Sequence, residues 1–384
     1  MVRTAINPDV LEWAMLESAR SVSDLESATQ KPRDEVEKWL SGAVSPHLGE
    51  LRRLGKLLGR SPFFFMLPEP PSSTPTAVEF RRALRKDINE DERAVELQAL
   101  RWGRRTQSVA RDLLNSADLL GNATTWAEDI ELDDQASPAR AAEQVRVWLA
   151  WDTATQVNAT SKSAAFKSLR AAVEERGVLV ALRSAGTSRF CGFSLPDPVA
   201  PLIYVNKDYE LGSVRSFTLM HELGHVLRGN RRVCYGGDKG VEQWCNRFAA
   251  AFLMPRQHLL RYWTSQSLSI TSPQDTDAVR RVANRYKTSW HASAVRLEQL
   301  GLAPSGTGDY VKKNRPESPE GGFAPGGGRT VPTIRLDEYG YAFARLVADA
   351  AEQGTLASLD ARRLLNVNGP ELAEVAALAR GRDR

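Results

Sequence analysis

The spacing of hydrophobic residues changes twice along the chain. Before residue 67 they recur every three to four positions in short amphipathic segments, and this helical period returns at about 79–119, 137–149 and 163–175. Three short runs then interrupt it, GVLVALR, RFCGFSL and PLIYVN, whose Val, Ile and aromatic content predicts a small β-sheet. Helical spacing resumes from about Ser213 to Gly229 and in GVEQWCNRFAAAFL, which ends at Met254–Pro255. The pattern predicts an α+β fold that is mostly helical.

Two segments rich in breaker residues divide the chain. LPEPPSSTPT at 67–76 contains four prolines, and the stretch that begins GTGDYVKKN continues into a run of Gly and Pro. Between them TDAVRRVANRYKTSWHASAVRLEQLG has the spacing of two helices joined by a turn. We expect an N-terminal domain at 1–70, a linker at 71–78, a domain at 79–304 with a helical lead-in at 79–175 and a core at about 176–262, a connection at 305–333, and a helical region at 334–384.

Composition favours a soluble protein of ordinary character. Hydrophobic residues make up 42% and charged residues 26%, and no apolar run reaches the about 18–20 residues that span a bilayer. The start lacks an apolar signal core, and three cysteines are an odd, sparse set that suits a reducing compartment. We expect a cytoplasmic protein with no membrane partner. The net charge of +4 permits nucleic-acid contact without requiring it.

The stretch SFTLMHELGHVLRGN, residues 216–230, contains the candidate chemistry. Residues four apart share one face of a helix, so His221 and His225 can offer both imidazoles to one metal ion. Glu222 lies about 100° around the helix, where its carboxylate can reach a water in an open metal position. With five histidines in the chain, chance would produce this motif on the order of once in a few hundred such sequences. The spacing predicts a Zn²⁺ site with Glu222 as the catalytic base.

A catalytic zinc site needs a third protein ligand. Glu242 is the best candidate, because it follows His225 by 17 residues near the start of the next predicted helix. Cys234 and Cys245 are thiols within conceivable reach, although Cys245 is better explained as a small apolar residue beside Phe248. The remaining histidines are weaker candidates: His47 belongs to the N-terminal domain, and His258 and His291 are expected beyond helix ends.

RSFTLMHELGHVLRG, followed by VEQWCNRFAAAFLMP, resembles the ImmA/IrrE metallopeptidases, whose pattern has Phe-Thr-Leu before HELGH and then E-x-x-x-N-x-F-A with a Met-Pro close. The resemblance extends through GFSLPDPVAPLIYVN, YKTSWHASAVRLEQLGL and the tail GGGRTVPTIRLDEYGYAFARLV. It implies a zincin-like, gluzincin-like zinc metallo-endopeptidase with His221, His225 and Glu242 as ligands and Glu222 as base. One departure is Trp244-Cys245, where the family more often has a charged residue and Ala.

Substrate binding and oxyanion stabilisation are less defined by the sequence. PLIYVN is either an edge strand that pairs with an extended substrate or an ordinary core strand. Tyr204, His258 and several arginines are all candidates for the oxyanion donor, and the sequence does not choose among them.

Residues 21–60 resemble an XRE/Cro-type helix-turn-helix domain, a module that commonly precedes an ImmA/IrrE peptidase. The recognition helix would run from about Pro32 to Leu40, but it is acidic, and residues 1–71 carry nine Lys/Arg against ten Asp/Glu. Arg52, Arg53, Lys56 and Arg60 form a basic face on the next helix. Weak or dimer-dependent DNA binding and protein docking both remain open. The candidate DNA contacts are Arg33, Lys38, Arg52, Arg53 and Lys56.

Two functions follow. By resemblance, the chain cleaves a protein substrate, a helix-turn-helix repressor, and so controls transcription in a stress, phage or mobile-element response. The alternative is an XRE-type regulator whose metal site is structural or sensory. The glutamate beside the first histidine favours the enzyme, because a structural site needs no base.

Overall fold

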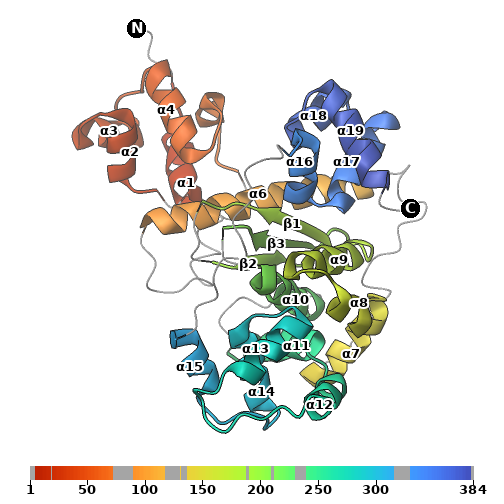
Figure 1. Cartoon of the computed structure of the whole chain (residues 1–384). Coiled ribbons are helices and arrows are strands. Elements are labelled where there is room, and N and C mark those ends of the chain that lie inside the picture. The colour runs from red at the N-terminus through yellow and green to blue at the C-terminus, as the bar shows by residue number, and fades with distance from the viewer. Residues whose placement is uncertain are drawn as a thin grey trace. The chain divides into compact units, whose positions relative to one another are not determined.

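The computed structural model describes residues 5–18, 20–71, 90–116, 130, 136–186, 190–208, 212–229, 239–314 and 329–381 (Figure 1). Contacts divide the chain into two compact units, one made mainly of residues 1–104 and the other mainly of residues 105–384. Cys234, the greater part of the expected linker and the Gly/Pro-rich residues 315–328 lie outside the described residues. The described elements are mostly helices with one small sheet, which confirms the α+β prediction.

The first unit is a set of short helices around one apolar core. Its elements are α1 (Pro8–Ser18), α2 (Val22–Thr29), α3 (Arg33–Leu40), α4 (Leu48–Leu58), the 3-10 helix η1 (Pro62–Met66) and the beginning of α6 (Glu90–Leu114). A capping box in which Ser21 and Asp24 bond each other's backbone N–H fixes the start of α2. Leu25, Val36 and Trp39 are fully buried in the core between these helices. The predicted recognition segment is therefore a real helix, α3, packed by its apolar face.

The second unit begins with the end of α6 and three helices that precede the sheet. These are α7 (Pro138–Trp148), α8 (Thr153–Asn158) and α9 (Lys162–Glu174). Ser137 and Ser161 accept hydrogen bonds from backbone N–H groups in the first turns of α7 and α9, which places both helix starts within two residues of the sequence prediction.

The sheet has three strands in the order β1-β3-β2. Strands β1 (Leu179–Arg183) and β3 (Leu202–Asn206) are parallel, and β2 (Gly192–Leu195) runs antiparallel to β3. The PLIYVN run is thus the central strand, buried along its whole length, so the edge-strand alternative for it was wrong. A strand buried on both faces has no polar alternation, which is why its sequence could not settle its place.

One face of the sheet is covered by helix α10 (Gly212–Gly229), which contacts β2 and β3 (Figure 1). Val180, Ile203 and Val205 point from the strands into the core shared with Leu219 and Leu223 of α10. The remaining helices of this part of the chain are α11 (Lys239–Leu253), α12 (Arg256–Ser265), α13 (Asp277–Tyr286), α14 (Trp290–Gln299) and α15 (Thr307–Asn314). The predicted helix pair corresponds to α13 and α14.

Polar side chains from three other helices hold the C-terminal end of α11. The last carbonyls of a helix have no partner within the helix. Here Arg146 donates to the carbonyl of Phe252, Gln156 to that of Leu253 (2.9 Å), and Arg296 to that of Met254 (3.2 Å). These donors come from α7, α8 and α14. Helix α11 is therefore fixed by elements distant in sequence.

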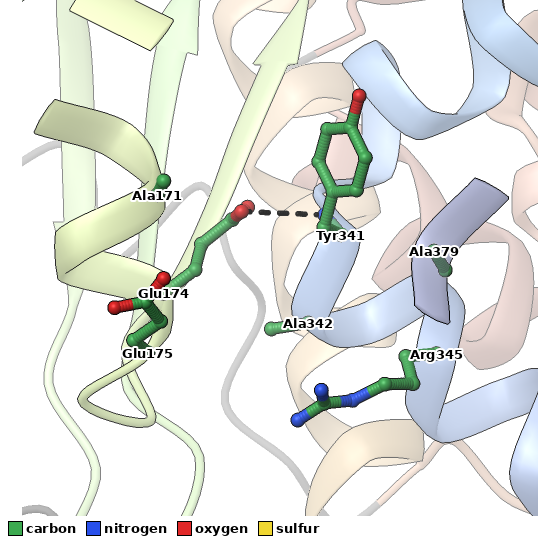
Figure 2. A pocket seen from close by; sticks show the side chains of 7 residues that line it. All are labelled: Ala171, Glu174, Glu175, Tyr341, Ala342, Arg345 and Ala379. Atoms are coloured by element: carbon green, nitrogen blue, oxygen red, sulfur yellow. Dashed lines mark hydrogen bonds between the residues drawn. The ribbon is translucent and has the colours of Figure 1, made fainter. Parts of the chain in front are cut away.

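The C-terminal helices are α16 (Val331–Tyr339), α17 (Tyr341–Glu352), α18 (Ser358–Leu365) and α19 (Gly369–Arg380). Helix α16 contacts β1, and α17 contacts α9. Figure 2 shows the joint between α9 and α17, where the N–H of Tyr341 donates to Glu174 (3.4 Å) beside a pocket whose lining includes Ala171, Ala342 and Arg345. None of the predicted metal ligands lines this pocket, so it is a packing joint separate from the metal centre.

Among the described helices, none is both long and apolar enough to cross a membrane.

Candidate metal centre

Helices α10 and α11 pack closely, and the HELGH glycine permits this. A Cβ atom at Gly224 would lie 3.2 Å from the sulfur of Cys245 and 3.2 Å from a ring carbon of Phe248. Both contacts are tighter than ordinary van der Waals packing, so a Cβ atom at position 224 would require the side chains of Cys245 and Phe248 to give way by a few tenths of an ångström. The close approach brings the start of α11 to the face of α10 that carries both histidines.

Three predicted ligands converge at this contact. The Nε2 atoms of His221 and His225 are 3.1 Å apart. One carboxylate oxygen of Glu242 lies 3.2 Å from Nε2 of His225, and the other lies 3.4 Å from Nε2 of His221. Each histidine side chain is about one sixth exposed (16% and 15%) and Glu242 is 45% exposed, so the group opens toward solvent on the carboxylate side.

The donor set fits a zinc ion. A tetrahedral ion with bonds of about 2.0–2.1 Å separates its ligand atoms by about 3.3 Å. The two imidazole nitrogens are 3.1 Å apart, and each lies 3.2–3.4 Å from a different oxygen of Glu242, so these separations are close to that value. Two imidazoles and one carboxylate are also a ligand set used by catalytic zinc sites, which leave one position for water or substrate. Among the described residues, these three form the group of His, Cys, Asp and Glu side chains that could hold a metal ion.

Asn246 orients the first histidine. Its side-chain oxygen lies 3.1 Å from Nδ1 of His221, so the Nδ1–H donates to Asn246 and Nε2 is turned toward His225 and Glu242. Asn246 stands four residues after Glu242 and therefore on the same face of α11. The sequence prediction included this asparagine in the quoted motif but gave it no role; its spacing from Glu242 was the available signal.

Charge reinforces the geometry. Hydrogen bonds from His221 and His225 lower the pKa of Glu242 far below its usual range, so its carboxylate is ionised. Burial alone would lower the pKa of His225, but hydrogen bonds with Cys245 and Glu242, together with the charge of Glu222, raise it to about 11. The acidic side chains thus favour a positive charge beside the histidines, and a metal ion would compete there with protons for the same nitrogen atoms.

Glu222 lies apart from the ligand triangle. It is only 9% exposed, and one of its carboxylate oxygens accepts a hydrogen bond from the hydroxyl of Ser194 on β2 (2.9 Å). The base predicted from the motif is therefore held between the helix and the edge of the sheet. Nothing in the sequence near HELGH pointed to Ser194.

Several weaker candidates lie elsewhere. His258 and His291 are inside α12 and α14, not beyond helix ends; His258 bonds the hydroxyl of Tyr286 (2.6 Å), and His291 bonds the carbonyl of Gly308 (3.1 Å). Tyr204 points to the sheet face opposite Ser194, stacks on Phe193 and donates to the carbonyl of Arg183 (3.2 Å). The tyrosine is thus excluded as the oxyanion donor.

The unusual pair Trp244-Cys245 is accommodated by packing. Trp244 stacks on Phe248, carries the Arg228 guanidinium over its ring at 4.7 Å and donates its indole N–H to the carbonyl of Ala136 (3.2 Å). Cys245 is fully buried, as expected of a small apolar residue, and its thiol also hydrogen-bonds with His225. Neither residue displaces Glu242.

In the first unit, the predicted DNA contacts fall into two groups. On α3, Arg33 pairs with Glu37 (2.8 Å) and Lys38 with Asp34 (3.1 Å), all four being exposed. On α4, the three cations Arg52, Arg53 and Lys56 are exposed, and within the described part of the chain they form no ion pair.

Arg60 does not belong to that basic face. It is partly buried, lies over the rings of Trp13 (5.4 Å) and Phe64 (4.8 Å), and pairs with Glu17 at 3.7 Å. Its side chain stabilises the core of the unit.

The close helix pair, the small sheet and the His-His-Glu group define a metallopeptidase-type domain. Residues 173–298 match the model of the IrrE N-terminal-like domain, a Peptidase_M78 domain, over 126 of the 384 residues. The matched range runs from the end of α9 to α14 and so contains the whole candidate centre. No curated protein and no solved structure matched the chain.

Proposed function

We propose that this chain is a zinc-dependent endopeptidase. The observation that carries the proposal is the convergence of His221, His225 and Glu242 within 4.8 Å of one another, beside an acidic side chain that is not part of the group. A bound zinc ion would supply Lewis acidity, which lowers the pKa of water and polarises a peptide carbonyl. The match to a peptidase domain model supports the same chemistry.

The protein groups have separate tasks in this reaction. Glu222 removes a proton from the attacking water and passes it to the leaving amine, because it is the carboxylate next to the ligands that is not engaged by a histidine. Asn246 keeps Nε2 of His221 free to act as a ligand. Glu242 completes the ligand set from the neighbouring helix.

The substrate is proposed to be an extended protein segment. Strand β2 is an edge of the described sheet, is partly exposed along its length, and carries Ser194 beside the base. An extended peptide can add to such an edge through backbone hydrogen bonds. We therefore propose the substrate-pairing role, which was one of two alternatives for PLIYVN, for the GFSL strand β2. We propose that the target is a repressor with its own helix-turn-helix, and that its cleavage relieves repression of transcription.

The experiment is incubation of the zinc-loaded full chain with the proteins encoded next to its gene, followed by mass spectrometry. Cleavage of one of them at a defined bond is expected. The matched control is Glu222→Gln, which should bind zinc and cleave about 10²- to 10⁴-fold more slowly, because an amide cannot accept the water's proton. Equal cleavage by the variant would remove Glu222 from the mechanism.

The alternative function is a regulator whose metal site is structural or sensory. The presence of an acidic side chain outside the His-His-Glu group disfavours it, since a structural site needs no proton acceptor. A parent protein that binds zinc but cleaves none of the neighbouring proteins would favour this alternative.

The N-terminal module is proposed to bind nucleic acid weakly, through phosphates. Its support is the set of three exposed cations on α4, since phosphate contacts supply most non-specific affinity. The paired cations on α3 favour low sequence specificity.

A further inference from the structure

Strand β2 and helix α10 lie side by side in a fixed register. A Cβ atom at Gly192 would lie 2.4 Å from the carbonyl oxygen of Tyr204 and 2.8 Å from the Cγ2 of Thr218, so the strand is pressed against the helix at this point. Two residues along a strand cover about 6.6–6.8 Å and four residues along a helix about 6 Å. The step from Gly192 to Ser194 therefore matches the step from Thr218 to Glu222.

The end of β2 is fixed as well. Gln107 of α6 donates to the carbonyls of Leu195 (2.8 Å) and Ala200 (3.0 Å). Asp197 accepts from the N–H groups of Val199 (2.9 Å) and Ala200 (2.8 Å) and pairs with Arg111. The strand cannot slide along α10 without breaking these bonds, so the position of the Ser194 hydroxyl is set by the fold.

That hydroxyl engages one oxygen of the base. The hydroxyl of Ser194 donates to Oε2 of Glu222 at 2.9 Å. No hydrogen bond joins Oε1 of Glu222 to any of the described residues. One oxygen is held and the other is left to accept a proton.

We propose that Ser194 is a positioning residue that holds the Glu222 carboxylate in the orientation in which Oε1 accepts the proton. The inference rests on the proposed peptidase function, since it concerns the same base. Because β2 is also the edge at which an extended substrate would bind, the serine links the substrate-binding strand to the proton acceptor.

The test uses two probes of the zinc-loaded full chain, acetohydroxamic acid and azide. Acetohydroxamic acid binds as its anion after its proton passes to the base, whereas azide is already an anion and needs no proton acceptor. The ratio of the two dissociation constants, measured by calorimetry at one pH, therefore reports on the base and cancels changes in the ligand set. It requires no protein substrate.

Ser194→Ala should weaken acetohydroxamate relative to azide by about tenfold, as expected for loss of a hydrogen bond to a charged group. Ser194→Thr should restore most of the ratio, because it keeps the hydroxyl. Ser184→Ala is the matched control: Ser184 also donates to a carboxylate, that of Asp208 (2.6 Å), but at an exposed position after β1, and its loss should leave the ratio unchanged. Zinc content and thermal melting verify that all variants are folded.

The experiment distinguishes failure of the Ser194 role from failure of the proposed peptidase function. If Ser194→Ala leaves the ratio unchanged while Glu222→Gln lowers it, the serine does not position the base, and this inference is overturned alone. If Glu222→Gln also leaves it unchanged, or the parent binds neither probe, the proposed function is overturned and this inference with it. An equal loss in Ser194→Ala and Ser194→Thr contradicts a role for the hydroxyl.

Discussion

In the second unit, side chains from α10 and α11 converge on one point, whereas on α3 of the first unit each cation is paired one turn away on its own helix. His221, His225 and Glu242 come from two helices; the two imidazole nitrogens lie 3.1 Å apart, and each lies 3.2–3.4 Å from one of the two oxygens of Glu242. Arg33 and Lys38 are joined to carboxylates four residues away on α3 and are more than half exposed. Both regions are rich in ionisable groups. Of the two, only the α10–α11 contact in the second unit turns several of these groups toward one point, where a single metal ion could contact them all.

This difference between the two regions indicates which ionisable side chains can contribute free energy to the binding of a metal ion or a phosphate. His221, His225 and Glu242 are brought together by the packing of α10 against α11 at Gly224. Because this packing fixes the three side chains close together, a metal ion that binds there can contact all of them at once. A pair within one helix is already satisfied in water and contributes little to either stability or binding. The predictions below test this contrast from its largest expected effect to its smallest.

Loss of the third ligand should have the largest effect. Glu242→Ala removes the carboxylate that faces both histidines, and we expect zinc affinity to fall by more than the about 10- to 100-fold typical of an outer-shell change. Competition with a chromophoric chelator measures it. Unaltered affinity would show that a residue outside the described segments, such as Cys234, is the third ligand.

Loss of the orienting asparagine should be milder. Asn246→Ala leaves all three ligands but frees the imidazole of His221 to change its tautomer, so zinc affinity should fall by about 10- to 100-fold. Asn246→Asp keeps an acceptor at the same place and should retain affinity. If both variants bind zinc like the parent, the hydrogen bond to Nδ1 has no role in ligation.

A buried carboxylate near β2 should give the second unit an acid-sensitive step. Burial alone would raise the pKa of Asp197, but the bond from Arg111 and the N–H groups of Ala200 and Val199 together lower it. A lowered folded-state pKa stabilises the fold above the usual carboxyl pKa of about 4, and this stabilisation is lost as pH falls through the lowered value.

Asp197→Asn should therefore reduce stability at pH 7 by about 1–2 kcal/mol, a modest value because Arg111 is 39% exposed. Urea titrations at several pH values should show the difference between parent and variant shrinking in acid. Glu50→Gln tests the same effect in the first unit. Burial would raise the pKa of the Glu50 carboxyl group, but the N–H of His47 and the Lys31 ammonium together lower it. A difference that grows as the pH falls would contradict the assigned direction.

Local elements were predictable because their signals lie within a few residues. The helices predicted at 137–149 and 163–175 begin at Pro138 and Lys162, and the four-residue spacing of His221 and His225 placed both imidazoles on one face. The long-range arrangement was not predictable. PLIYVN is uniformly apolar, so its central place follows only from pairing with strands on both sides.

The same distinction explains the missed site residues. Asn246 stands four residues from Glu242, so helical spacing alone could have suggested it. Ser194 precedes Glu222 by 28 residues, and their contact depends on the register of β2 against α10, which no local pattern contains. Arg60 was placed on the wrong surface for a related reason, since its aromatic partners and Glu17 lie on other elements.

The smallest effects should come from single cations of the N-terminal module. If Arg52, Arg53 and Lys56 contact phosphates, the logarithm of the DNA affinity should fall with the logarithm of salt with a slope of about −2.7, and each alanine substitution should reduce the slope by about 0.9 whatever the sequence. Arg33→Ala should leave the slope unchanged, because Glu37 already holds that guanidinium. Titrations of the full chain between about 50 and about 200 mM salt measure it. A slope that depends on Arg33 and Lys38 would mean that α3 exchanges its internal ion pairs for contacts with phosphates. The contrast between α3 and the metal centre would then be lost. Absence of binding to any duplex would instead favour a protein-docking module.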